Sequence, residues 1–292
     1  MQDTENFNRQ YRFAAGPAGG DGFEIGAATP AQPVPLHISF SLEKSDLTTH
    51  NTGKISLWNL SKEHLSVLNQ EDCAASLRAG YKDRMSLIFA GIINHTKTSL
   101  DGSDRKTEIE LTDNLIELRD TYVSVSYQGK VNWKTIYDDT ANKIGVVVSY
   151  SYNAEFADID NGFSYVGPAQ DILNKGCDCC GLSWSIQNGV LQIKKPDDVM
   201  SREVYVLSSA TGLIGIPSKI TDAKSKSGAN SASAKKGWEV EFFLNGAINI
   251  DDFVKLESDT VSGYFRVAKI KYEGDNLNGD WICTAQLLEV AE

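Results

Sequence analysis

A cysteine-rich segment in the middle of the chain is the first candidate for metal chemistry. Cys177, Cys179 and Cys180 lie close together, and Cys73 and Cys283 complete the five cysteines. Zinc sites use four ligands, usually as two separated pairs, and neither the other cysteines nor the four histidines supply a second pair. The spacing of Cys177 and Cys180 instead fits the apolar stripe of a helix. We therefore predict no metal site, with Cys179 the more exposed thiol.

Acidic residues form the second set of candidates. Residues 158–162 (Asp-Ile-Asp-Asn-Gly) resemble the start of a calcium loop, but the glycine falls at the fifth position instead of the sixth, which favours a polar turn between a strand and a helix. The adjacent carboxylates Asp138–Asp139 and Asp251–Asp252 could act as an acid and a base, yet neighbouring side chains point to different faces. No nucleophile elbow, zinc-protease helix or phosphate-binding loop is present. The sequence thus predicts no catalytic residue and no cofactor.

Several aromatic residues raise the alternative of a carbohydrate-binding surface, in which exposed rings stack on sugars. Trp184 and Trp238 fall within alternating strand patterns, where an aromatic side chain usually belongs to a core or an interface. The same packing role is favoured for the whole set, which comprises Trp58, Tyr81, Trp184, Trp238 and Trp281.

The composition limits the classes of function. A chain of 292 residues with 41% hydrophobic and 23% charged residues has the profile of a folded protein with room for two domains. Its net charge of −11 argues against general nucleic-acid binding, because neutralising phosphates requires clustered Lys and Arg. No apolar run is long enough to span a bilayer and no secretory signal pattern opens the sequence. We therefore expect a cytosolic protein whose odd number of cysteines forms no disulfide framework.

Strand patterns fill the first part of the chain. Residues 36–42 alternate strictly between apolar and polar, and residues 54–60 and 107–112 follow the same period of two. Residues 73–79 and 85–93 are predicted as further strands. The polar residues 96–106 predict a turn between the strands at 85–93 and 107–112.

The middle of the chain changes character. Asn132 is a suitable N-cap for an amphipathic helix that Gly145 ends, and a second helix follows Pro168. The turn Asn188-Gly189 then joins two short alternating strands, which is a strong hairpin signal. This region therefore predicts a small α+β unit inserted between β-rich flanks.

The C-terminal part returns to strands at residues 238–244, 253–256, 263–272 and 281–290. Before them, residues 218–237 are rich in Ser, Ala and Lys without apolar periodicity, which predicts a flexible loop.

A weak internal repeat relates the two β-rich flanks. The strand order and turns of residues 54–111 can be laid over residues 239–288, with Gly80-Tyr81 matching Gly263-Tyr264. The match lies in pattern and not in identity. It indicates two similar barrel-like domains, so that three copies of the chain would present six similar domains around one axis.

Six segments follow one another along the chain, namely residues 38–45, 55–61, 77–81 with 88–93, 182–193, 212–217, and 254–256 with 263–267. Together they resemble the baseplate hub family of contractile-tailed phages and phage-like bacteriocins, the late control protein D type. The resemblance implies a structural homotrimer that lies beneath the tail tube and holds the central spike. It further implies baseplate wedge components and the tape measure protein as partners, DNA that passes without specific binding, no membrane contact, and assembly in the host cytoplasm into the virion tail. One departure is a longer, more basic loop after Pro217.

The expected fold is β-rich, α+β overall, with two tail-tube-like β-barrel domains and an inserted small α+β domain. The predicted boundaries are 1–125 for the first barrel, which may share strands with the C-terminal part, 126–200 for the insertion and 201–292 for the second barrel. The alternative function is a cell-wall-directed carbohydrate-binding or hydrolytic module of a phage tail. The residues predicted to face partners are Lys219, Lys224, Lys226, Lys235, Lys236, Asp101, Asp104, Asp275 and Asn278.

Overall fold

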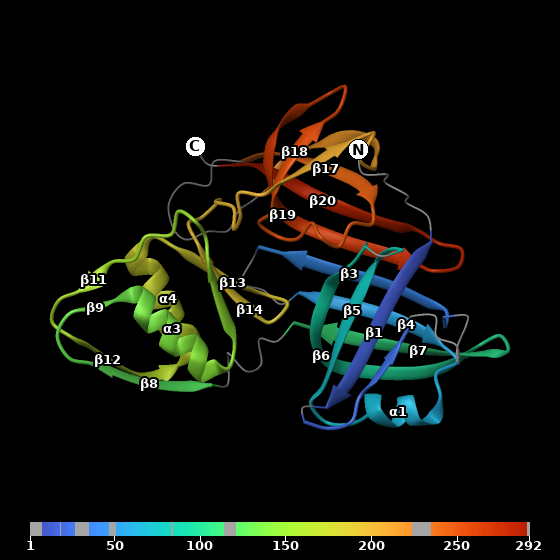
Figure 1. The fold of residues 1–292 in the computed structure, drawn as a ribbon, viewed down its shortest axis with the longest axis horizontal. Helices are drawn as coiled ribbons and strands as arrows, with labels where there is room; N and C mark the ends of the chain where they lie inside the picture. Colours follow the sequence, from blue (N-terminus) through green and yellow to red (C-terminus); the bar gives the residue numbers. More distant parts are fainter. Residues whose placement is uncertain are drawn as a thin grey trace.

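The computed structural model describes residues 8–17, 19–26, 35–46, 51–82, 84–113, 121–223 and 235–290. Most strands join one large sheet, while helices α3 and α4 lie to one side of it with small sheets of their own (Figure 1). The β-rich fold with an inserted α+β part is therefore confirmed.

The first β unit is built from alternating strands. In β3 the side chains of Ile38, Phe40 and Leu42 are buried while the residues between them are not, as a strand with one face on a core requires. Helix α1 begins after Ser61, whose hydroxyl accepts a hydrogen bond from the backbone amide of His64. The elements are β1 (Arg9–Pro17), β2 (Phe23–Ile25), β3 (Ile38–Ser45), β4 (Thr52–Trp58), α1 (Lys62–Leu68), β5 (Cys73–Tyr81), β6 (Arg84–Asp101) and β7 (Asp104–Thr112).

The inserted unit has a separate apolar core. Asn132 caps α3 by accepting a hydrogen bond from the amide of Lys134, and Gly145 ends the helix in the left-handed conformation. Pro168 directly precedes the first residue of α4. The elements are β8 (Tyr122–Tyr127), β9 (Val131–Asn132), α3 (Trp133–Ile144), β10 (Val147–Tyr150), β11 (Asp158–Ile159), β12 (Phe163–Pro168), α4 (Ala169–Cys180), β13 (Ser183–Gln187) and β14 (Val190–Lys194).

The second β unit corrects one prediction. Residues 218–223 and 235–237, expected within a flexible loop, belong to paired strands, and residues 224–234 lie outside the described part. The ladder here is defined by backbone hydrogen bonds, and its sequence is mostly polar, so it lacks the apolar alternation that sequence reasoning needs. The elements are β15 (Val204–Ser208), β16 (Leu213–Ala223), β17 (Lys235–Phe243), β18 (Phe253–Glu257), β19 (Ser262–Asp275) and β20 (Trp281–Glu289).

A similar correction applies to residues 96–106. Instead of a polar turn, strands β6 and β7 continue as a long hairpin arm that turns between Asp101 and Asp104. Residues 158–162 also differ from expectation, because they lead into strand β12 before the helix.

The two β units share one sheet. Its strands follow the order β16-β17-β20-β19-β3-β4-β7-β6-β5-β1-β2, with β18 and β15 attached beside β19, and β3 pairs with β19 across the middle (Figure 1). One apolar core runs through both units, whereas a second core lies within the inserted unit. The domain boundaries at 125/126 and 200/201 remain predictions.

The strand order agrees with an internal repeat, but Gly80-Tyr81 ends β5 whereas Gly263-Tyr264 lies at the start of β19, so these two pairs are not equivalent as the sequence pattern predicted. The first unit contains the series β3-β4-β7-β6-β5, and the second contains β16-β17-β20-β19-β18 in the same sequence of neighbours. Both units also interrupt equivalent ladders, since β6 shifts register against β7 between Ile93 and His95, and β19 shifts against β20 between Val267 and Lys269.

Candidate interaction site

The structure joins two of the predicted partner-facing segments through a chain of contacts. At the β6–β7 turn, Asp101 Oδ2 accepts a hydrogen bond of 2.9 Å from Trp58 Nε1. The Trp58 ring stacks on His37 with centroids 3.8 Å apart, and His37 Nε2 lies 3.0 Å from Asp275 Oδ2. Asp104 is fixed separately, because its Oδ1 accepts from Asn59 Nδ2 at 2.9 Å. These contacts unite two polar turns from the two β units into one surface.

The loop after β19 is ordered by Asp275. Its Oδ1 accepts hydrogen bonds from the amides of Leu277 (2.8 Å) and Asn278 (3.1 Å). Burial alone would raise the pKa of Asp275, but the hydrogen bonds from His37 and these amides outweigh it and hold the pKa below its usual value. The carboxylate is therefore a fixed anchor of the loop.

The predicted lysines do not form one loop. Lys219 is exposed on strand β16, whereas Lys235 and Lys236 begin β17. Lys224 and Lys226 lie outside the described residues.

A buried ionic cluster attaches the inserted unit to the two β units. Asp251 Oδ1 lies 2.7 Å from Lys194 Nζ and 2.6 Å from Arg266 Nη1, and all three side chains are at most 4% exposed. Arg266 also contacts Asp46 (2.6 Å) and Asp197 (3.3 Å). Burial lowers the pKa of Lys194 and raises that of Asp251, because it disfavours the charged form of each.

A second buried polar group lies beside this cluster. The Asn51 side chain donates to Asp113 (2.5 Å) and to Gln187 (3.0 Å), and Gln187 donates to the backbone carbonyl of Ser45 (2.9 Å). Burial lowers the pKa of Lys44 to about 7 and raises the pKa of Asp113 to about 6. Gln187 thus ties the inserted hairpin to the first β unit through polar contacts.

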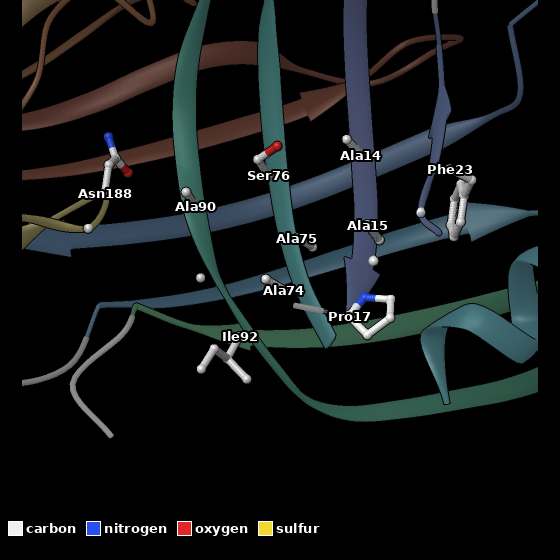
Figure 2. Close-up of a pocket in the computed structure, with 14 residues that line it drawn as sticks. Ala14, Ala15, Pro17, Phe23, Ala74, Ala75, Ser76, Ala90, Ile92 and Asn188 are labelled. Atoms are coloured by element: carbon white, nitrogen blue, oxygen red, sulfur yellow. The ribbon is translucent and has the colours of Figure 1, made fainter. Parts of the chain in front are cut away.

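A shallow groove of about 460 Å³ separates the inserted hairpin from the outer face of β1, β5 and β6. Figure 2 shows Asn188 to one side of the strand that carries Ala90, with the strands that carry Ser76 and Ala14 beyond it. The lining residues include no acid, base or thiol, so no lining group could activate the Ser76 hydroxyl as a nucleophile.

The other candidate residues have structural contacts. Cys177 is buried, Cys180 is half-buried and Cys179 is exposed, as predicted, and all five thiols are free. Within the described ranges no group of three or more His, Cys, Asp or Glu residues could hold a metal. Asp138 and Asp139 accept hydrogen bonds from Tyr150 (2.7 Å) and Tyr127 (2.5 Å).

The five aromatic residues singled out in the sequence do not form an exposed platform. Trp184, Trp281 and Tyr81 are buried at 4%, 2% and 7% exposure, and Trp58 and Trp238 are half-buried. This removes the exposed row that stacking on sugars would require. In the part of the chain that the structure covers, no helix has the length and apolar character needed to cross a membrane.

The fold defined by these units is that of phage tail proteins. No protein-family model matches the chain, and no curated protein matches its sequence. The likeness is therefore one of structure.

Two bacterial tail proteins align over almost their whole length. A 43 kDa tail protein of prophage MuSo2 from Shewanella oneidensis gives a TM-score of 0.60 at 11% identity, covering 96% of this chain and 98% of the other. A tail protein from Neisseria meningitidis MC58 gives 0.59 at 11% identity, with 97% of each chain covered. An E. coli protein described as a type VI secretion component, with structural similarity to T4 tail proteins gp27 and gp5, gives 0.56 at 11% identity over 88% of this chain and 75% of the other. The predicted resemblance to phage tail and baseplate proteins is confirmed at the level of the fold.

Proposed function

We propose that this protein is a structural baseplate hub subunit of a phage tail or a related injection machine. The observation that carries the proposal is the pair of β units with equivalent strand order in one chain. Three copies arranged around an axis would present six similar units toward a six-fold tube and three identical chains toward a three-fold spike. The fold shared with phage tail proteins supports this assignment.

In this role the protein acts mechanically and not as an enzyme. The homotrimer joins the tail tube protein to the central spike, contacts baseplate wedge components, and lines the conduit for the tape measure protein and DNA. The net charge of −11 supports a wall that repels phosphates. The surface around Asp101, Asp104, Asp275 and Asn278 is proposed to face one of these partners.

The test is the mass of the purified protein by light scattering, alone and mixed with the spike and tube proteins of the same gene cluster. A trimer, or a monomer that becomes trimeric with the spike, is the expected result. A monomer that binds neither the spike protein nor the tube protein would rule out the hub role. A loss of turbidity on purified cell wall, abolished by an acid-to-amide substitution, would favour the hydrolytic alternative.

A further inference from the structure

Equivalent strands of the two β units differ in what covers their edges. Strand β3 has β4 on one edge and β19 on the other, whereas its equivalent β16 has β17 on one edge and no partner among the described residues on the other. Strand β19 carries β3 along its C-terminal half. The equivalent half of β6 pairs with β7 alone within the same described ranges. The chain therefore has two open edges whose counterparts form a closed junction inside it.

The shared bulge fixes how β6 and β19 correspond. Aligning the shift after Ile93 with the shift after Val267 places His95 on Lys269 and Asp101 on Asp275. Strand β3 covers Lys269 to Asp275 of β19 residue by residue. The open stretch of β6 is consequently residues 95–101.

The same ladders show which residues of the open edge of β16 and the open edge of β6 would lie opposite one another. Lys54 and Glu239 are equivalent, because each is joined through one intervening strand to the residue that follows the bulge. Their partners Ser41 and Ser218 are then equivalent, and so are Leu42 and Lys219. Leu42 lies opposite Tyr272, whose counterpart on β6 is Thr98.

The local chemistry limits the pairing to a short stretch. Gly215 has a left-handed backbone (φ 66°) and Pro217 has no amide hydrogen, so both interrupt the N-terminal half of β16. Ser218 and Lys219 beyond this interruption are exposed, as are Thr98 and Ser99 on β6. Long unpaired strand edges such as these are templates for adding a strand from another chain.

We propose that residues 218–222 of β16 in one copy add antiparallel to residues 95–99 of β6 in a second copy, with Lys219 opposite Thr98. Each copy offers one edge of each kind, so the contact runs head to tail and can close into a ring. The proposal rests on the homotrimer proposed above, in which three such junctions alternate with the three internal β3–β19 junctions. The occupant of the open edge is thus a second copy of this chain.

The test is disulfide trapping in the full-length protein carrying Thr98→Cys and Lys219→Cys, with Cys179→Ser removing the exposed thiol. Directly opposed residues of an antiparallel pair lie close enough for a disulfide. Oxidation is expected to give covalent dimers and trimers on a non-reducing gel, several-fold more than either single-cysteine variant. The matched control pairs Thr98→Cys with Ser218→Cys, which a one-residue offset places on the opposite face.

Light scattering on the same samples, with and without spike, separates the two proposals. A trimer without intermolecular disulfides would overturn the strand pairing and leave the hub role standing. Equal trapping in the control pair would overturn the register. A protein that stays monomeric and unlinked, with circular dichroism showing it folded, would contradict both.

Discussion

Two seams within the molecule are built on opposite principles. The apolar seam between the β units consists of β3 against β19, where Gly274 lies between the rings of Phe40 and Trp281. These rings pack edge to face at 5.3 Å. The polar seam to the inserted unit consists of the two buried polar groups around Asp251 and Asn51, and the buried Lys44 of β3 lies near Asp113 of the second group.

The difference shows which parts of the protein depend on solution conditions. The apolar seam extends a ladder of backbone hydrogen bonds over a shared core, so its stability does not depend on protonation except through Lys44, which lies opposite Ile270 in this ladder. The polar seam holds ionisable groups away from water, and it keeps its geometry only while each charge has its partner. The attachment of the inserted unit is therefore expected to depend on pH more strongly than the ladder between β3 and β19 does.

The largest expected effect comes from Arg266→Met in the polar seam. It leaves Asp251 buried with Lys194 alone and removes the partner of Asp46, which should lower the free energy of unfolding by about 3–5 kcal/mol. Urea unfolding measures the loss. Lys269→Met, which breaks the exposed pair with Glu43, is the control and should change stability by less than about 1 kcal/mol. Equal losses of stability in both variants would contradict the proposed difference between the buried and the exposed ion pairs.

The second effect is a pH dependence set by Lys44. Its pKa falls from 10.5 to about 7 in the folded protein. Between these values the unfolded chain binds a proton that the folded chain does not, so stability rises with pH from about 7 to 10, by roughly 2–4 kcal/mol. Lys44→Met should abolish this rise in urea titrations, whereas Lys54→Met on the exposed neighbouring strand should retain it. A rise that persists in Lys44→Met would show that another group controls it.

Asp113 and Asp252 should make the stability of the protein depend on pH in the acid range as well. Burial raises both pKa values from 3.8 to about 6, so the folded protein holds protons that the unfolded chain releases in this range. Their contribution to stability therefore falls as pH rises from about 4 to 6. In Asp113→Asn this fall should be smaller, and an unchanged slope would exclude Asp113 as a source.

A smaller effect is expected in the apolar seam from Gly274→Ala. A Cβ at this position would lie 2.2 Å from Phe40 and 2.8 Å from Trp281, so the rings must move, at a cost of about 1–3 kcal/mol. Thermal unfolding at pH 6 and pH 9 should show the same loss at both values. Gly263→Ala in the same strand is the control, because its Cβ meets only the Phe265 ring at 3.2 Å. A loss that varied with pH would break the distinction between the seams.

The smallest effect is expected at the surface, from His37→Ala. Removing the ring that stacks on Trp58 and contacts Asp275 should cost about 0.5–1 kcal/mol. The pKa of Asp275 should rise toward its ordinary value, because a hydrogen bond to its charged form is lost. Side-chain NMR titration measures this shift, and His95→Ala serves as the exposed control. An unchanged Asp275 titration would show that His37 does not lower the pKa of Asp275.

The sequence predicted those parts of the fold that periodicity or turn chemistry encodes. The alternation at Ile38, Phe40 and Leu42, the cap Asn132 and the Asn188-Gly189 turn all correspond to the observed elements. The strands at residues 96–101 and 218–223 were missed, because their surfaces are polar and only backbone hydrogen bonds define them.

The contacts of the site were beyond sequence reasoning for a different reason. His37 and Asp275 meet across 238 positions of the chain, and Lys194 meets Asp251 across 57. In the sequence, Asp251 stands out only as one of two adjacent acids. A charged residue inside an apolar stretch, such as Arg266 between Phe265 and Val267, is the one local hint that could have suggested a buried ion pair.

The most direct test of the central claim is electron microscopy of the purified oligomer viewed along its axis. We expect three-fold particles in which six similar β lobes surround a central opening, with the inserted units as three distinct features. Averages with two-fold symmetry, or with three lobes in place of six around the opening, would contradict it.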